Sequence, residues 1–307
     1  MKVFLYKLKF IFSNPLSIIW KIFRNFSSII GFVTTIFTIL DTIIKDNKHI
    51  VFLCENVLYF FIGTLVIALI LSVKWIPSIT YKINETDSYL SIKVGDITEE
   101  KKSIIISTNT SFITTMKDDI ISEKSAQGAF QKKFYKDSLD ELDKKIADGL
   151  TQFVSRSNLV LNNSRKKYPV YDVGTVSKIR QNNRNVYFLA LNDINSVGQN
   201  ENRMELDFYT ALSGLWEFIK KMGNTEDASI HLIASGRSGL NITKEESLKE
   251  IIKSYIGQSQ NYKLLTKLTI YIYPTDLKYI NIKRVKKFVE NQCMFAETNN
   301  NKGKGEK

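Results

Sequence analysis

The sequence predicts a membrane-anchored α/β protein, in which a two-helix transmembrane hairpin precedes a layered domain of alternating strands and helices. Two observations predict this organisation. Apolar residues concentrate before Lys74, whereas most of the charged residues follow it. From about Tyr89 onward, short runs of β-branched residues alternate with segments of helical periodicity, a pattern typical of an α/β domain.

The first 25 residues predict a basic amphipathic segment on the cytoplasmic face of the membrane. They interleave aromatic and aliphatic side chains with five basic residues and no acidic one; the basic residues are Lys2, Lys7, Lys9, Lys21 and Arg24. Anionic lipid head groups attract such segments. Much of the net charge of +12 is therefore expected beside the bilayer. Because the chain has no aromatic–basic RNA motif and no zinc-finger spacing, we do not expect a nucleic-acid partner.

Two apolar runs predict the hairpin, which we place at residues 26–76. The first span, 26–44, contains one charged residue, Asp41, and about 19 residues of helix cover ~28 Å, near the thickness of the hydrocarbon core. The polar stretch 45–49 separates it from the second span, 50–73. Lys74 and Trp75 then suit the membrane interface, and Pro77 ends the helix.

The basic flanks predict the orientation of the hairpin. Five basic residues precede the first span and Lys74 and Lys82 follow the second, against Lys45 and Lys48 in the turn. The positive-inside rule then places both termini in the cytoplasm. We expect the membrane to be the inner membrane or plasma membrane of the cell. A cleaved signal peptide is the alternative for the first span, but the apolar run is too long and no small-residue cleavage site follows it.

Three polar residues fall near the outer end of the hairpin: Asp41, Glu55 and Asn56. One interpretation is that they reach the interface or pair with the lysines of the turn. The other is that they line a polar path when several hairpins assemble, because intramembrane carboxylates are costly and often functional.

A linker at 77–88 is expected to lead into a cytoplasmic α/β domain at 89–292, followed by a disordered tail at 293–307, which is rich in Asn, Gly and Lys. The strands expected in this domain are Tyr89–Val94, Ser103–Ser107, Asn185–Leu191, Ser229–Ala234 and Leu268–Tyr273. The expected helices are Gly128–Phe153, Glu205–Lys221, Lys244–Ile256 and Ile282–Asn291. Thr243 and Glu246 have the spacing of a capping box at the start of the third helix.

Three segments have the composition of ligand-binding loops. Val94-Gly95-Asp96-Ile97 ends the first strand in a glycine followed by a carboxylate, Ser107–Ser111 comes at the end of the second strand, and Ser235–Leu240 (SGRSGL) follows a late strand. In open α/β sheets ligands bind beyond the carboxyl ends of the strands, and glycines let backbone N–H groups approach a phosphate. Each segment taken alone is also compatible with an ordinary structural turn.

The order of these segments resembles the macro domain, a three-layer α/β module that binds ADP-ribose, over about Tyr89 to Asn291. The resemblance implies that Asp96 contacts the adenine amino group, that Ile97 lies against the ring, and that Asn109 lies near the distal ribose. Thr110, next to Asn109, is also expected to bind the ligand. The resemblance also implies that the late turn wraps the diphosphate; that turn comprises Ser235, Gly236, Arg237, Ser238, Gly239 and Leu240.

The chain departs from hydrolytic macro domains in the stretch after the second strand. Those domains carry a further asparagine and a run of glycines there, whereas this stretch has Gly128 alone. It has no histidine and no paired carboxylate suited to general acid–base work; the adjacent Asp118 and Asp119 suit a solvated turn. We therefore expect a binding domain without catalytic residues, metal or cofactor, and the alternative is a membrane-tethered ADP-ribosyl hydrolase.

A narrower resemblance joins the hairpin to this divergent domain: the chain is similar to the membrane effectors of type II Thoeris anti-phage systems. The motif SAQGAF, which contains Gln127 and Gly128, fits that subgroup. The resemblance implies a messenger, a histidine–ADP-ribose conjugate made by a TIR-domain partner, whose binding promotes homo-oligomer assembly and membrane disruption. Phe112, Gln127 and Phe130 are candidates to contact the group joined to ADP-ribose. A third possibility is a module that only recruits a partner protein to the membrane.

Overall fold

The computed structural model describes residues 15–44, 51–52, 55–72, 78–117, 120–160, 167–194, 201–222, 226–233 and 242–296. The chain divides into two compact units, Met1–Pro77 and Ser78–Lys307.

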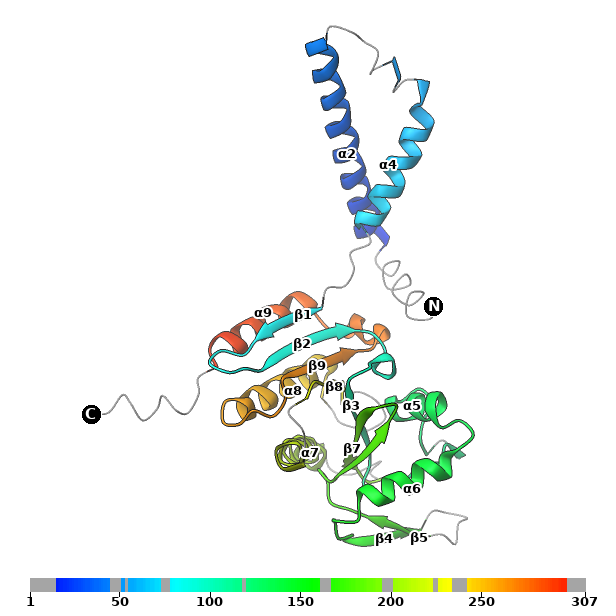
Figure 1. Ribbon diagram of the computed structural model, residues 1–307, viewed down its shortest axis with the longest axis vertical. Coiled ribbons are helices and arrows are strands. Elements are labelled where there is room, and N and C mark those ends of the chain that lie inside the picture. The colour runs from blue at the N-terminus through cyan, green and yellow to red at the C-terminus, as the bar shows by residue number, and fades with distance from the viewer. Residues whose placement is uncertain are drawn as a thin grey trace, which may run out of the picture. The chain divides into compact units, whose positions relative to one another are not determined.

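The first unit contains two apolar helices, α2 (Pro15–Ile44) and α4 (Val57–Ser72), which pack against each other (Figure 1). Phe26 and Phe61 meet edge to face, with ring centroids 4.9 Å apart. Within α2, Ile22–Ile43 is long and apolar enough to cross a membrane, and Val57–Leu69 is a shorter apolar helix. Residues 73–77, which include the expected interfacial anchor, and the expected turn at 45–49 lie outside the described residues.

The helix α2 begins eleven residues before the first span that we expected. Proline at the first helical position has the required φ and lacks only an N–H that no carbonyl would accept, so Pro15 starts the helix. Residues 15–25 are therefore continuous with the apolar run. The hydroxyls of Thr34, Thr35 and Thr38 donate to carbonyls one turn earlier, at 2.7–3.1 Å, which satisfies them without a partner helix.

The second unit is built on a seven-stranded sheet of order β1-β2-β9-β8-β3-β7-β6. Its strands are β1 (Ile79–Lys82), β2 (Tyr89–Val94), β3 (Ser103–Asn109), β6 (Val176–Gln181), β7 (Arg184–Asn192), β8 (Ala228–His231) and β9 (Lys267–Ile272). The five central strands are parallel, and β1 and β6 pair antiparallel at the two edges. The carboxyl ends of the five parallel strands consequently meet at one edge of the sheet.

Helices cover both faces of this sheet and make a three-layer sandwich (Figure 1). They are α5 (Ala126–Phe134), α6 (Leu139–Gly149), α7 (Glu201–Met222), α8 (Lys244–Ser259) and α9 (Ile282–Met294). Successive side chains of a strand point to opposite faces. Ile104 and Ile106 of β3 accordingly belong to the core beneath α5 and α6, while Ile105 faces the layer of α7 and α8. The sheet and both cores are made within this unit.

Four of the five expected strands lie within two residues of the observed bounds, and the capping box of Thr243 and Glu246 is present. The fifth strand, expected at Ser229–Ala234, is β8, which ends three residues earlier, at His231. The single helix expected at Gly128–Phe153 is wrong: α5 ends at Phe134 and α6 starts at Leu139. Between them, the Tyr135 ring is buried in the core and Ser138 starts a helix with two acidic residues in its first turn, which suits a new amino terminus.

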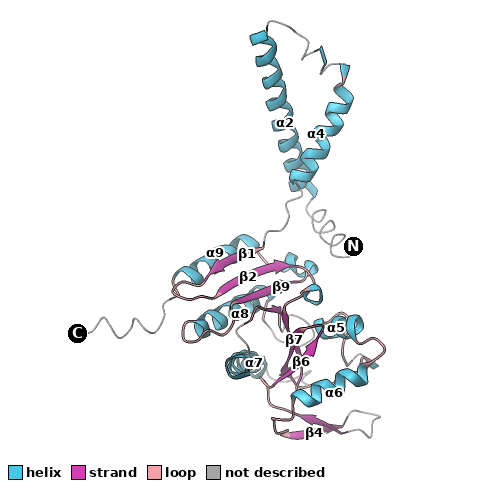
Figure 2. Ribbon diagram, in the orientation of Figure 1, coloured by secondary structure: helices cyan, strands magenta, loops and turns pink. Residues whose placement is uncertain are grey.

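Four strands were not anticipated. The stretch expected as a linker contains β1, and a separate two-stranded ribbon, β4 (Ser157–Val160) with β5 (Lys167–Val170), lies apart from the main sheet (Figure 2). The edge strand β6 was also missed.

At the carboxyl-terminal end of the chain, α9 runs to Met294 and buries Cys293, so the expected tail begins later than 293. Residues 297–307 lie outside the described residues.

The contact between α7 and the turn before β6 gives a stability prediction. A Cβ on Gly214 would lie 2.5 Å from the carbonyl oxygen of Gly174, so the backbone of α7 or of the turn must shift to admit it. We expect Gly214→Ala to lower the free energy of unfolding by about 1–3 kcal/mol. Gly257 is the control: it lies within α8 with open space around it, and Gly257→Ala should raise stability by about 0.5–1 kcal/mol. Equal effects of the two changes in denaturant unfolding would contradict this packing.

Candidate ligand-binding site

The first ligand-type segment follows β2 and forms a short helical turn. Asp96 is the amino-terminal cap of η1 (Ile97–Glu99), and its Oδ1 accepts a hydrogen bond from the Thr98 N–H at 2.9 Å. The side chain is half-buried and therefore remains accessible to a ligand. Ile97, expected against an adenine ring, is only 4% exposed and packs in the core beneath α5 and α6.

The second segment follows β3, and Asn109 organises it. The Asn109 side chain is 8% exposed; its Oδ1 accepts from the N–H groups of Ser111 and Ile113, both at 3.1 Å, and its Nδ2 donates to the Ile113 carbonyl at 3.2 Å. Phe112 adopts a positive φ of 51° inside this loop, which costs energy for a residue other than glycine. The asparagine amide therefore holds a tight and strained turn.

Helix α5 fixes the same loop from the other side. The Nε2 atom of Gln127 donates to the Ile113 carbonyl at 3.0 Å, and that of Gln131 donates to the Thr114 carbonyl at 2.6 Å. Gly128 is required for close packing, because a Cβ there would lie 2.2 Å from the Ser122 carbonyl oxygen. Asn109 and Gln127 thus both donate to the Ile113 carbonyl, Gly128 lies one residue further along α5, and the described contacts of all three are with the chain itself.

Phe112 and Phe130, which we named as candidate contacts for the group joined to ADP-ribose, are both buried. Phe112 is edge to face with Tyr171, with ring centroids 5.7 Å apart, and Phe130 packs against Phe188 at 5.7 Å. Both rings support the loop from inside.

The third segment, Ser235–Leu240, lies outside the described residues, but the chain on either side of it is placed. The Ser247 Oγ in the first turn of α8 donates to the Ile233 carbonyl just after β8, at 2.6 Å. The segment therefore leaves and rejoins the fold at the carboxyl edge of the sheet. The first turn of α8 carries Glu245 and Glu246, so this helix end is poorly suited to bind an anion.

His231 holds β3 and β8 where they separate. The pairing of these strands extends from Ser103–Ala228 to Ile105–Ile230, and beyond it the Nε2 atom of His231 accepts the Ser107 N–H at 3.2 Å. The Nδ1 atom lies 2.8 Å from the Leu232 carbonyl oxygen. Because Nε2 accepts a backbone N–H, the ring is neutral and carries its proton on Nδ1. Burial lowers the pKa of His231 to about 4.

A cavity of about 480 Å³ lies between the carboxyl ends of β3 and β7 and the ribbon of β4 and β5. Its lining includes Thr110, Ser111, Arg156, Asn158, Val170 and Asp193. Asp193 Oδ1 accepts from the Thr110 hydroxyl at 2.5 Å and from the Arg156 guanidinium at 2.6 Å. Thr110 was predicted from the sequence; Arg156 and Asp193 were not, because the ribbon that brings Arg156 here was not anticipated. The lining residues do not include Asp96.

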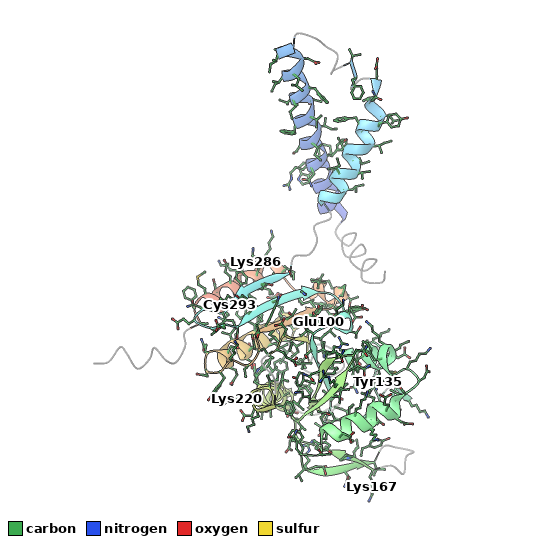
Figure 3. All side chains as sticks on the ribbon, viewed as in Figure 1. Glu100, Tyr135, Lys167, Lys220, Lys286 and Cys293 are labelled. Atoms are coloured by element: carbon green, nitrogen blue, oxygen red, sulfur yellow. The ribbon has the colours of Figure 1, made fainter. Side chains whose placement is uncertain are left out.

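The remaining polar clusters that we describe stabilise the fold. Glu226, before β8, accepts hydrogen bonds from Ser103, Asn185 and Tyr187 at the amino edge of the sheet, away from the loops above. Figure 3 marks Glu100, whose carboxylate accepts from the hydroxyl of Tyr271 at 2.8 Å. Among the described residues, no group of three or more His, Cys, Asp or Glu side chains is placed to hold a metal ion.

A sheet of this order, covered by helices on both faces and with ligand-type loops at one edge, defines a macro-domain protein. The family described as Thoeris protein ThsA, macro domain, matches residues 90–273, and the chain belongs to that family. A Thoeris protein ThsA of Bacillus amyloliquefaciens (strain Y2) is 25% identical over 238 residues, which cover 74% of this chain and 77% of that protein.

Solved structures of an Oceanobacillus iheyensis macrodomain are also similar. One, with MES bound, is 17% identical with a TM-score of 0.49 and covers 70% of this chain and 98% of its own. Another, a glycine-to-valine mutant with ADPR, is 16% identical with a TM-score of 0.46 and covers 71% and 98%.

The protonation state of His231 gives a pH prediction. Its folded pKa of about 4 lies below the ordinary value of 6.5, so between these values the unfolded chain binds more protons than the folded one. The stabilisation is complete above pH 6.5 and is lost as the pH falls toward 4, by up to about 3 kcal/mol. Unfolding of the wild type and of His231→Asn should therefore converge with falling pH, and a constant difference across this range would refute the assignment.

Proposed function

We propose that the chain is a membrane-anchored effector of a bacterial anti-phage defence system, whose macro domain binds an ADP-ribose-derived messenger. The observation that carries the proposal is that the carboxyl ends of β2, β3 and β8, after which the three ligand-type segments follow in the chain, lie at one edge of the sheet in a chain of the ThsA macro-domain family. The macrodomain solved with ADPR supports this class of ligand.

The spacing of the loops fits a ligand of dinucleotide size. The ends of β2 and β3 are three strand spacings apart in the sheet, about 14 Å at 4.8 Å each. With the adenine amino group at the Asp96 carboxylate, the diphosphate would cross the end of β8, the strand that Ser235–Leu240 follows in the chain. The distal ribose would then lie at the loop of Asn109 and Thr110. Asn109 acts here by shaping the loop, because its amide is already hydrogen-bonded to that loop.

Binding without turnover is part of the proposal. His231 is the one histidine in the second unit, and its Nε2 already accepts a backbone N–H. To deprotonate a water, His231 would have to give up its hydrogen bond with the Ser107 N–H. Its lowered pKa also makes His231 a weak base. The Asn109 amide is already hydrogen-bonded to its own loop, so it is not free to act on a substrate, which favours a receptor over a hydrolase.

The first unit supplies the effector part. We propose that α2 and α4 form a hairpin that spans the membrane twice, with both termini in the cytoplasm. A TIR-domain partner makes the messenger, for which a histidine–ADP-ribose conjugate is the leading candidate. Binding promotes assembly of several copies and disruption of the bilayer. A ligand drives such a change only through a higher affinity for the assembled state.

Calorimetry on Ser78–Lys307 tests the ligand. We expect ADP-ribose or its histidine conjugate to bind, and Asp96→Asn to weaken binding about tenfold or more, because the neutral amide keeps the acceptor for the Thr98 N–H but loses the charge that strengthens a bond to the adenine amino group. Asp87→Asn makes the same charge change on an exposed residue before β2 and should bind normally. No heat with either compound defeats the proposal, and release of free ADP-ribose from the conjugate indicates a hydrolase.

Assembly is tested on the full chain in lipid vesicles. The histidine conjugate should produce cross-linked oligomers and release a trapped dye, and Asp96→Asn should require a correspondingly higher concentration of the conjugate. Vesicles carrying Asp87→Asn serve as the control. Dye release that is independent of the conjugate, or oligomers already complete without it, would mean that the messenger does not control the hairpin.

A further inference from the structure

The cavity between β4, β5 and the sheet lies beyond the place that ADP-ribose occupies in the proposed function. It opens at the ends of β3 and β7, and β7 is four strand spacings from β2, about 19 Å. A ligand that extends from Asp96 to the loop of Asn109 therefore reaches the rim of the cavity without filling it. A volume of about 480 Å³ suits a small organic group.

Among the described residues that line this cavity, one side chain is positive and one is negative, and the two are paired. Arg156 and Asp193 form an ion pair at 2.6 Å, with 35% and 33% of their side chains exposed. The Thr110 hydroxyl donates to the same carboxylate oxygen at 2.5 Å, which fixes Asp193 to the end of β3. A guanidinium has five N–H donors in one plane, and one of them is used on Asp193. The arrangement orients the guanidinium and leaves it donors for a ligand.

The lining also shows which charge a ligand should carry. An arginine fork binds carboxylates and phosphates in two-point contacts. The neighbouring Asp193 carboxylate would repel a phosphate with two negative charges, whereas it attracts an ammonium group. An amino acid carries both a carboxylate and an amine. Its carboxylate is opposite in charge to Arg156, and its ammonium group is opposite in charge to Asp193.

We propose that this cavity is the subsite for the group joined to ADP-ribose and that it selects an amino-acid group, with Arg156 binding the carboxylate and Asp193 placing Arg156. This inference rests on the proposed function, because it assumes an ADP-ribose bound at the adjacent loops. It assigns the selection to the ribbon of β4 and β5, in place of the buried Phe112 and Phe130.

Calorimetry on Ser78–Lys307 tests the subsite with three probes: ADP-ribose, its histidine conjugate, and ADP-ribose with a phosphate on the terminal ribose. The wild type should prefer the conjugate to both others. Arg156→Gln should lower the affinity for the conjugate between about 10- and 100-fold, the contribution of a charge-assisted hydrogen bond. Its affinity for ADP-ribose should stay unchanged. Arg180→Gln, an exposed arginine on β6, is the matched control and should bind all three probes normally.

A second variant covers the case in which Arg156→Gln fails to fold. Asn158→Trp changes an exposed lining residue of β4 and should obstruct the cavity while Arg156 and Asp193 remain. It should exclude the conjugate and still bind ADP-ribose.

The outcomes separate the two proposals. If the wild type binds none of the probes, the proposed function fails. If it binds the conjugate and folded Arg156→Gln keeps the full preference for it, or if the phosphate probe binds more tightly than the conjugate, this inference alone fails.

Discussion

The parallel pairing of β3 with β8 on one side and β7 on the other is the constraint on which the second unit depends. This strand contributes to the cores on both faces of the sheet, because its residues Ile104, Ile105 and Ile106 are fully buried. The pairing with β8 stops after Ile105, and the ring of His231 takes the next N–H of β3 in place of a carbonyl. The pairing can end there because that donor is still satisfied, and the carboxyl ends of such parallel strands are where α/β sheets bind ligands.

The loops at this edge are held by their own side chains, and that changes the roles of several residues. Asn109, Gln127 and Gly128 lie together, but they fix the turn from Asn109 to Thr114 and its contact with α5. Asp96 has an accessible carboxylate, and Arg156 with Asp193 supplies charge beside a cavity. The internally hydrogen-bonded loop lies between these two positions, and a preorganised loop lowers the cost of ordering it around the ligand that we propose.

The sequence predicted the buried parallel strands well, because runs such as SIIIS have no other stable position than the interior of a sheet. It did not predict β1, β4, β5 and β6, which are short or alternate with polar residues and are stabilised by pairing. Asn182 and Asn183, both with positive φ, are a recognisable signal for the β6–β7 hairpin. The Arg156–Asp193 pair joins residues 37 positions apart, and only the fold of the ribbon brings them together. The side-chain roles at Asn109 and Gln127 likewise depend on carbonyls that no sequence pattern reveals.

Hydrogen exchange of Ser78–Lys307, with and without the histidine conjugate of ADP-ribose, tests the central claim most directly, because it reports where the ligand lies without any substitution. We expect protection to increase at 95–99, 109–114 and 234–241, the segments that follow β2, β3 and β8 in the chain, while the amino edge around Ser103 and Glu226 is unchanged. Protection confined to the amino edge, or to the outer surface of α9, would contradict that claim.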